Sequence, residues 1–486
     1  MPTAKLSDPK LPRPIPDSTA WSVWIGCGLV LFAATLGLRA LSPRFVYGSD
    51  HLDRPILLMA ALLSGSGLAY CLAIWTVQRS QGMWRLTLWI LAVGIAMRVA
   101  MFTSTPILED DHYRYLWDGG VAASGHNPYA YIPDEARRVV EAPHIPDAVR
   151  ELSADAGHVY TRVNHPQYGT VYPPVAQAAF AVAHWLRPWS LQAWRVVLIL
   201  FDIATLSLIA MLIRRLDRPT HYAAIYWWNP LVVKETVNTA HMDAIALPFV
   251  LLALYFALRS APVRSGMAFA LGIASKLWPI AIVPVVLRYM KASPWRLAVA
   301  VGVSAALLSV LLSPILVAVR LGDDSGFLAY GRGWEMNDAL FMVFLKVSEV
   351  GSGLLGGDPS GPTVELTART LVATALVLWI LYLCRRPIEE PQDLCNRIVL
   401  VMSALFLLSP TQFPWYYLWL IPFLTLSPRA SMLSLTVTLP MYYLRFHFEY
   451  RDNTEIFDNG VVWLEFAPAF ILLLWEGRRA LPRRAV

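Results

Sequence analysis

The chain has 486 residues, of which 56% are apolar and 15% are charged, and its mean hydropathy is +0.48. The apolar residues form long blocks and do not alternate with polar ones, which excludes an ordinary soluble domain and predicts an all-α polytopic membrane protein. The formal charge of +6 comes from basic residues in short loops between these blocks. It therefore indicates membrane orientation and no nucleic-acid partner.

The four cysteines are scattered along the chain without CxxC spacing, so the sequence predicts neither a disulfide framework nor a zinc site. The polar, proline-rich N-terminus lacks the pattern of a cleavable signal peptide. We therefore expect the first apolar segment to act as its own insertion signal.

A spanning helix needs about 20 apolar residues, and this length divides the chain into spans. We expect one transmembrane domain over residues 20–476, with a cytoplasmic tail over 1–19 and a basic cytoplasmic tail over 477–486. Segments 174–188 and 266–288 are short or broken by proline and could be re-entrant, which gives about 12 to 14 transmembrane or re-entrant helices. The predicted spans are 20–42, 55–77, 86–103, 193–213, 221–237, 242–258, 297–319, 366–384, 397–409, 414–428, 430–446 and 460–476.

Lysine and arginine residues cluster at one side of these spans, which the positive-inside rule assigns to the cytoplasm. Both tails lie on that side, provided that 174–188 and 266–288 do not cross fully. The long loop 104–173 and the segment Asn229–Asp243 then face the extracytoplasmic side. The unusual polar motifs fall on that side as well.

An acidic and aromatic run, Glu109–Gly120, follows directly on the apolar segment 86–103. Carboxylates this dense at the mouth of a span cost several kcal/mol to desolvate unless they face a cavity filled with water or ligand. Glu109, Asp110 and Asp111 therefore indicate a sugar-binding or catalytic site. A solvated loop start is the structural alternative.

Other polar residues of the loop 104–173 allow two interpretations. Tyr113 lies beside the acids, where it could contact a sugar. His126, His165 and Tyr172 lie in proline-containing turns, for which turn packing and substrate contact are equally compatible with the pattern. Arg114 and Asp118 are four residues apart, which favours an ion pair on one helical turn.

A second cluster lies at membrane depth. Asn229-Pro230 interrupts a helix and leaves Lys234, Glu235, His241 and Asp243 between apolar runs. Ionisable groups are rare in lipid and face a partner or a cavity. A lone buried histidine is usually structural, but these four residues together indicate an anion or sugar site.

Later segments add cations and aromatic residues on the same predicted face. These are Lys276, Arg332, Trp415 and Arg445. Tyr417 and Trp419 are expected to belong to an interfacial aromatic belt. The sequence holds no Walker loop, HExxH motif or GxSxG elbow, so ATP-driven, zinc-protease and serine-hydrolase functions lack their chemistry.

Taken in order from about residue 105 to about 420, the motifs resemble those of bacterial GT-C glycosyltransferases that use polyprenyl-phosphate sugars. The closest likeness is to the polyprenyl-phosphate-mannose-dependent mannosyltransferases. The motifs are Asp110–Gly119, Asn127-Pro128-Tyr129, Tyr172-Pro173-Pro174, Asn229-Pro230-Leu231 with Glu235, His241-x-Asp243, Ser275-Lys276-Leu277-x-Pro279 and Phe413-Pro414-Trp415-Tyr416.

The resemblance implies a GT-C-like enzyme of the bacterial cytoplasmic (inner) membrane with its active site on the extracytoplasmic face. It would transfer a sugar, mannose in this family, from a polyprenyl-phosphate donor to an unidentified acceptor hydroxyl on a lipid, glycan or protein. The family places the catalytic base in the first extracytoplasmic loop, which here is Asp111 or, failing it, Asp110. Direct displacement would invert the anomeric centre and convert a β-linked donor into an α-linked product.

This chemistry needs one base and cations for the departing phosphate. Lys234, His241 and Arg332 are the expected phosphate ligands. A Mg²⁺ or Mn²⁺ ion on Asp110 and Asp111 is compatible with their hard oxygens but not required. The full set of expected substrate contacts is Glu109, Tyr113, His126, His165, Tyr172, Lys234, Glu235, His241, Asp243, Lys276, Arg332, Trp415 and Arg445.

A transporter or lipid flippase is the main alternative, because it too would place charges at helix breaks in the membrane. It predicts internal repeats and charges accessible from both sides. The sequence shows no convincing repeat, and its motifs lie on one face. A sensor or assembly scaffold gives no reason for acidic and basic clusters to converge on a broken helix.

The predicted topology can be tested by labelling single cysteines from outside in a cysteine-free background. We expect Ser153→Cys, in the loop 104–173, to react with a membrane-impermeant reagent and Ser260→Cys to be spared. Permeabilised membranes, in which both positions should react, provide the control. The reverse pattern in intact cells would contradict the topology.

Overall fold

The computed structural model describes residues 17–77, 84–137, 145–318, 325–358 and 361–480. These residues are almost entirely helical, as the composition predicts, and they contain no strand. Met336 and Thr411 form a single parallel β-bridge. Most of both predicted tails lies outside the described residues, which begin with α1 at Asp17 and end with α23 at Ala480.

Within the described ranges, eight helices are long and apolar enough to cross a membrane, or nine if one bent pair counts as a single span. They coincide with eight of the predicted spans and confirm a polytopic membrane protein. They are α1 (Asp17–Leu41), α2 (Ile56–Val77), α3 (Trp84–Phe102), α8 (Leu191–Arg215), α14 (Pro294–Ala318), α17 (Pro362–Cys384), α18 (Pro391–Leu408) and α23 (Val462–Ala480).

The bent pair lies where the sequence predicts a broken helix. Pro230 lacks an N–H, and the Asn229 side chain accepts from the backbone N–H groups of Leu231 and Val232, so a new helix begins there. The two halves, Pro230–Asn238 and Met242–Leu258, meet at 105°. The elements are η4 (Thr220–Ala223), α9 (Ala224–Trp227), α10 (Pro230–Val233), the π-helix η5 (Lys234–Asn238), η6 (Met242–Ile245) and α11 (Ala246–Leu258).

The other predicted spans correspond to shorter or broken helices. Segment 266–288 is interrupted between Ile273 and Trp278, and 414–446 is divided into short pieces at its prolines. These elements are α12 (Pro262–Ile273), η7 (Trp278–Ile282), α13 (Val283–Tyr289), η8 (Tyr416–Trp419), α19 (Ile421–Leu424), α20 (Ala430–Thr438), η9 (Leu439–Tyr443) and α21 (Leu444–Glu449).

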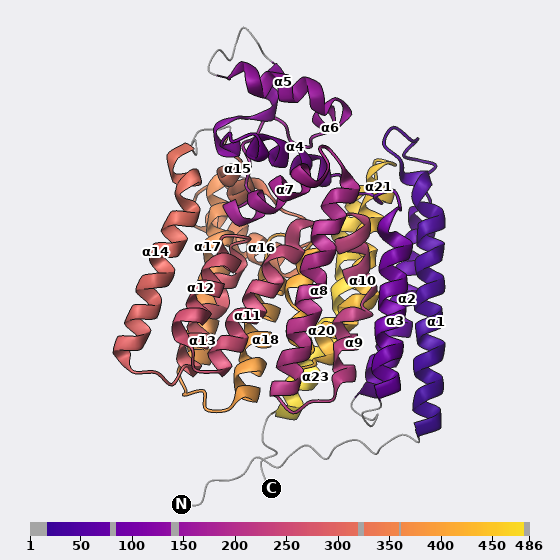
Figure 1. Ribbon diagram of the computed structural model, residues 1–486, viewed down its shortest axis with the longest axis vertical. Helices are drawn as coiled ribbons and strands as arrows, with labels where there is room; N and C mark the ends of the chain where they lie inside the picture. Colours follow the sequence, from indigo (N-terminus) through magenta and orange to yellow (C-terminus); the bar gives the residue numbers. More distant parts are fainter. Residues whose placement is uncertain (1–16, 78–83, 138–144, 319–324, 359–360, 481–486) are drawn as a thin grey trace, which may run out of the picture.

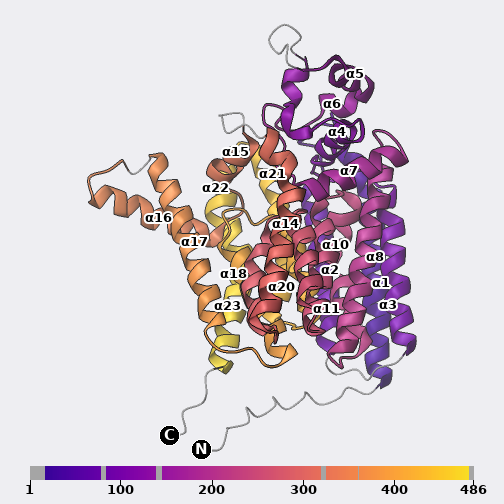
Figure 2. The same cartoon turned by 60° about the vertical axis from the view of Figure 1, so that its left-hand side comes forward.

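One end of the bundle carries a cap built mainly by the loop 104–173 (Figures 1 and 2). α4 lies on α7, and the contact is so close that a Cβ atom on Gly119 would lie 2.5 Å from the Phe180 carbonyl oxygen. α7 has 13 residues and lies in this cap. The cap elements are α4 (His112–Ala123), η2 (Pro128–Ala130), η3 (Pro133–Arg137), α5 (Asp147–Ala156), α6 (His158–Thr161) and α7 (Pro174–Leu186).

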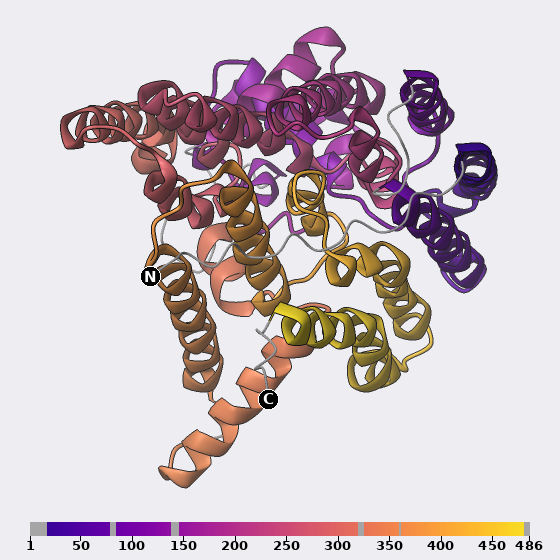
Figure 3. The same ribbon diagram turned by 90° about the horizontal axis from the view of Figure 1, so that it is seen from below.

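α1 begins and α23 ends at the opposite end of the bundle from this cap (Figure 1). Seen from below, α1 to α3 form the right-hand margin (Figure 3). This arrangement agrees with a loop 104–173 that lies across the membrane from both tails. The remaining elements are η1 (Ser42–Phe45), α15 (Gly326–Gly333), α16 (Ala339–Leu354), α22 (Thr454–Ile456) and the π-helix η10 (Phe457–Val461).

A buried ion pair joins α3, which leads into the acidic motif, to the bundle. Nε of Arg98 lies 2.5 Å from Oδ2 of Asp202 on α8, and both side chains are buried. Arg98 also donates to the Trp227 carbonyl at 2.9 Å, and Tyr226 donates to Asp202 at 2.7 Å. A buried pair is tolerated when further hydrogen bonds satisfy its remaining atoms, and here they fix α3 against α8 and α9.

Candidate active site

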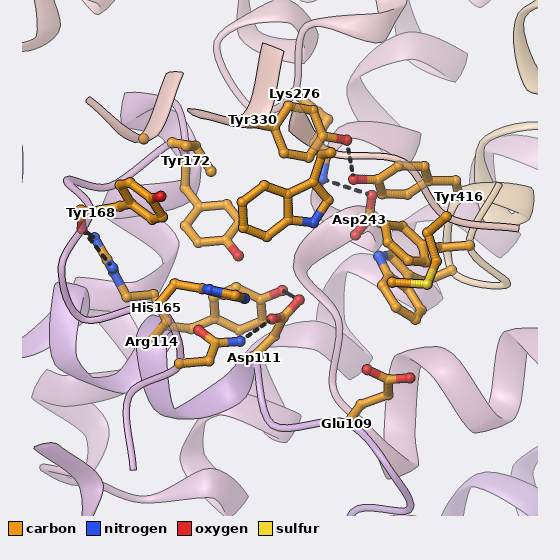
Figure 4. A pocket seen from close by; sticks show the side chains of 18 of the residues that line it. Glu109, Asp111, Arg114, His165, Tyr168, Tyr172, Asp243, Lys276, Tyr330 and Tyr416 are labelled. Atoms are coloured by element: carbon orange, nitrogen blue, oxygen red, sulfur yellow. Dashed lines mark hydrogen bonds and ion pairs between the residues drawn. The ribbon is translucent and has the colours of Figure 1, made fainter. Parts of the chain in front are cut away.

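A cavity of about 680 Å³ lies where the cap meets the broken helices. Its lining comes from the acidic loop, residues 164–173, α15 and its C-terminal flank, η7 and η8, and Figure 4 shows some of these side chains around the cavity. Its lining is therefore drawn from segments more than 300 residues apart in the sequence, from Glu109 to Phe446.

The loop that carries the acidic motif is held by one buried amide. Nδ2 of Asn238 donates to Oγ of Ser104 and to the Thr105 carbonyl, both at 2.7 Å, and the Ile107 N–H donates back to Oδ1 at 3.1 Å. Arg195 donates to the Phe102 carbonyl at 2.7 Å. The broken helix thus fixes the position of the acidic residues that follow.

Asp111 directly precedes α4, and three side chains surround its carboxylate. Nδ2 of Asn164 donates to Oδ1 of Asp111 at 2.6 Å and to Oδ1 of Asp110 at 3.1 Å. The Tyr115 hydroxyl donates to Oδ2 of Asp111 at 3.3 Å, and Nδ1 of His241 lies 3.6 Å from the same oxygen. The Asp111 side chain is 26% exposed, so its carboxylate is fixed in place yet open to the cavity.

The neighbouring carboxyl groups differ in protonation. Desolvation by the surrounding protein and then the negative charge of Asp111 raise the pKa of Asp110 to about 6, although part of this residue is exposed to solvent. Burial also opposes the ionisation of Asp111, but the His241 ring and the Asn164 amide outweigh it and lower the pKa of Asp111 to about 2. Burial raises the pKa of Glu109 well above its ordinary value. Asp111 is therefore the carboxylate that stays ionised throughout the neutral range.

A buried polar layer lies behind Asp111. Nε2 of His241 is 3.6 Å from Oε2 of Glu235, whose Oε1 accepts from the Tyr443 hydroxyl at 2.5 Å. Nζ of Lys234 lies 3.3 Å from the same Oε1, and these side chains are at most 1% exposed. Lys234 and Glu235 neutralise each other, and neither they nor His241 line the cavity. This geometry does not support the expected contact of Lys234 and His241 with phosphate.

Lys276 is the lysine that lines the cavity. Its Nζ lies 3.1 Å from Oδ1 of Asp243, which also accepts from Nε1 of Trp419 at 2.7 Å. The Lys276 side chain is 19% exposed, whereas Asp243 is 1% exposed. Figure 4 shows the two charged groups pointing toward one another at the cavity wall.

Aromatic rings form much of the remaining wall. Trp419 stacks on Tyr416 at 4.2 Å and on Trp278 at 5.8 Å between ring centroids. The Tyr416 hydroxyl shares a hydrogen bond of 2.6 Å with that of Tyr330 on α15. Trp415 lines the cavity and stacks on the buried His241 ring at 4.1 Å.

The belt interpretation of Tyr417 and Trp419 is wrong. Tyr417 is fully buried and its hydroxyl donates to the Met432 carbonyl at 2.7 Å. Trp419 is the last residue of the short 3-10 helix η8 and lines the cavity, so it does not lie along the lipid interface. Trp419 follows Trp415 by four residues in the sequence, and this spacing indicates that the two side chains could share one face.

Several expected contacts do line the cavity. Glu109 does so, and its Oε1 is buried without a hydrogen-bond partner. Tyr172 lies on the wall, as does His165, whose ring meets the edge of Trp334 at 4.7 Å. Burial lowers the pKa of His165, which favours the neutral ring at pH 7.

Four other expected contacts are placed differently. Tyr113 turns away and accepts from Nη1 of Arg162 at 2.9 Å, and His126 lies against Tyr131 at 6.0 Å between ring centroids. Neither lines the cavity, and Arg445 instead pairs with Glu449 at 3.2 Å. The side chain of Arg332 lies outside the described residues, although α15 carries its backbone along the cavity.

The predicted pair of Arg114 and Asp118 is confirmed at 3.0 Å. Arg114 also donates to the Tyr168 carbonyl at 3.1 Å, and Thr170 donates to Asp118 at 2.6 Å. The pair thus ties residues 164–170 to α4 and presents Asn164 to the acidic residues. The sequence pattern singles out the neighbouring His165 but not Asn164.

Among the described residues, no group of three or more His, Cys, Asp and Glu side chains could hold a metal ion. Asp110 and Asp111 share the Asn164 amide and have no further acidic ligand of that kind beside them. The metal assignment to Asp110 and Asp111 stays a prediction, which a chelator titration tests.

Two family models match the chain. The model described as alpha-(1->6)-mannopyranosyltransferase, N-terminal domain, matches residues 22–292, which is more than half of the chain. The chain belongs to this family. The MptB C-terminal domain matches residues 357–475. No curated protein and no solved structure gives a match.

This alpha-mannosyltransferase is therefore a membrane glycosyltransferase, and the transporter alternative is not favoured. The first match includes the acidic loop, Asp243 and Lys276, and the second includes the wall from Phe413 to Phe446. α15 and Trp334 lie between the two matched regions.

Replacing Lys234 tests its buried position. Lys234→Met leaves the Glu235 charge uncompensated, and breaking such a pair costs about 3–5 kcal/mol. We expect a clear fall in the thermal midpoint of the purified protein and a donor KM within about twofold of the parent for the folded fraction. Lys346→Met, which removes one half of an exposed pair with Glu349, is the control. An unchanged midpoint with a raised donor KM would place Lys234 on the donor.

Proposed function

We propose that this mannosyltransferase transfers mannose from a polyprenyl-phosphate donor to an acceptor hydroxyl on the extracytoplasmic face of the bacterial cytoplasmic membrane. The observation that carries the proposal is the oriented carboxylate of Asp111 on the wall of a cavity that Lys276 also lines. We assign Asp111 as the base that takes the proton of the acceptor hydroxyl.

The acceptor oxygen attacks the anomeric carbon while the bond from this carbon to the phosphate oxygen breaks. The proton of the hydroxyl passes to Asp111, and the leaving polyprenyl phosphate takes the electron pair. Attack opposite the leaving group inverts the anomeric centre, so a β-linked donor gives the α-linkage of this family. Lys276 then stabilises the negative charge that develops on the phosphate.

A lipid-linked donor also suits the position of the cavity. Leu277 and Trp278 line it next to Lys276, and Leu277 is 54% exposed on the surface of a membrane protein. Ile280, one helical turn further, is 62% exposed. An apolar, exposed margin beside a lysine fits a polyprenyl chain in the bilayer with its phosphate inside the cavity.

The orientation of the cavity follows from the ends of the chain. The cavity is lined in part by the acidic loop and residues 164–173 of the cap, and the cap lies at the end of the bundle away from the start of α1 and the end of α23 (Figure 1). The positive-inside rule assigns those two ends to the cytoplasm. We therefore infer that the cavity opens on the extracytoplasmic side, which suits a donor carried on a lipid phosphate in the membrane.

Transfer can be tested with purified protein, polyprenyl-phosphate-[³H]mannose and a membrane lipid extract. We expect labelled product from the parent and a loss of roughly 10²- to 10⁴-fold in kcat for Asp111→Asn, which deletes the proton acceptor but keeps the shape of the side chain. Donor binding should persist in the variant. Activity within a few-fold of the parent would reject Asp111 as the base.

The pH profile separates the two adjacent carboxylates. A base must be ionised, so activity falls as the pH drops through its pKa. With Asp111 as the base and its pKa at about 2, we expect kcat/KM to change less than about threefold between pH 5 and pH 8. A tenfold fall per pH unit below about 6, together with a loss of kcat in Asp110→Asn as large as that expected for Asp111→Asn, would assign the role to Asp110, whose pKa is about 6.

A further inference from the structure

One oxygen of Asp243 has no partner. Its Oδ1 accepts from Trp419 at 2.7 Å and lies 3.1 Å from Nζ of Lys276. Its Oδ2 is buried without a hydrogen bond, although the residue lines the cavity and is 1% exposed. A buried carboxylate oxygen left unpaired is costly, which indicates that a bound donor group completes the site.

The direction of this free oxygen is fixed. Trp419 and Lys276 hold Oδ1 from two sides, and Asp243 lies in the first turn of η6, which follows the bend of the broken helix. The carboxylate therefore cannot turn without losing both contacts. A fixed acceptor selects a ligand hydroxyl at one position more strongly than a mobile one does.

The surroundings match a sugar. Trp278, Trp419 and Tyr416 line the cavity and stack in sequence, and Trp419 in the middle donates to the carboxylate through Nε1. Aromatic faces cover the apolar C–H face of a pyranose ring, while a carboxylate accepts hydrogen bonds from its hydroxyl groups. Asp111 and the rest of the cavity remain open for the acceptor.

We propose that Oδ2 of Asp243 accepts a hydrogen bond from the 2-hydroxyl of the mannose that the donor carries, and that Asp243 thereby selects mannose over glucose. The inference rests on the proposed function. Lys276 contacts Asp243 on one side and the donor phosphate on the other, so the sugar hydroxyl nearest to that phosphate reaches Asp243. In a hexose 1-phosphate that group is the 2-hydroxyl, and its configuration is what distinguishes mannose from glucose.

Loss of a hydrogen bond to a charged group corresponds to a fall of roughly tenfold to a hundredfold in kcat/KM. A site built around a substrate hydroxyl discriminates against the analogue that lacks it, because the buried partner is then left unpaired. Asp243 is thus a specificity-determining residue and not the base.

The test compares polyprenyl-phosphate donors that carry mannose, 2-deoxymannose, 4-deoxymannose or glucose. The parent is expected to lose roughly tenfold to a hundredfold in kcat/KM on removal of the 2-hydroxyl. In Asp243→Asn, Trp419 and Lys276 hold the amide oxygen and leave an NH₂ group in place of Oδ2, so we expect the 2-deoxy penalty to shrink to a few-fold. Discrimination against the glucose donor should weaken in parallel.

The ratio of kcat/KM for the 2-deoxymannose donor to that for the mannose donor is measured in each enzyme. Comparing this ratio between the parent and the variant cancels the higher intrinsic reactivity of a 2-deoxy sugar. The 4-deoxy penalty should be equal in parent and variant, and Glu349→Gln, on the outer part of α16, should leave every ratio unchanged. If Asp243→Asn fails to fold, Trp419→Phe removes one donor to Oδ1 and should reduce the 2-deoxy penalty in part.

Equal 2-deoxy penalties in the parent and in the folded variant would overturn the inference and leave the proposed function intact. A penalty that changes at C4 but not at C2 would also overturn it. Absence of any mannose transfer by the parent would overturn the proposed function, and with it this assignment of Asp243.

Discussion

The site depends on one constraint, which is that a charge at membrane depth must be paired with another charge or with hydrogen-bond donors. Lys234 compensates Glu235, and His241 lies between Glu235 and Asp111 at 3.6 Å from each carboxylate. This chain of contacts connects the broken helix to the acidic loop. Without the bend between Asn238 and Met242, His241 would continue along the helix that carries Lys234 and Glu235, and these side chains would not meet in a layer beneath the cavity.

The polar layer and the cavity have separate tasks. The layer is sealed from solvent and sets the electrostatics of Asp111, which keeps its carboxylate ionised. The cavity holds Lys276 and Asp243 beside stacked aromatic rings. Fixed polar groups stabilise a transition state best where water is excluded. The rigid layer therefore holds Asp111 in position, and the cavity leaves room for the substrates.

Much of this was predictable because membrane burial restricts where ionisable residues can lie. The acidic run at Asp110 and Asp111, the helix break at Pro230 and the pair of Arg114 with Asp118 follow from local spacing, and the structure contains each of them. Local spacing was not enough to decide whether Lys234 and His241 bind the donor phosphate. The position of these two side chains between apolar runs shows that they need partners, but it does not show whether each partner is a ligand or another residue.

The sequence by itself determined an all-α membrane protein, its long spans and the segments that carry polar chemistry, since hydropathy and proline act locally. The tertiary structure alone decided which groups face the cavity. It buried Lys234 behind Asp111, turned Trp419 inward, and brought Asn164 within 2.6 Å of Asp111. These outcomes depend on contacts between segments far apart in the chain, and the packing of whole helices, which no local pattern encodes, selects them.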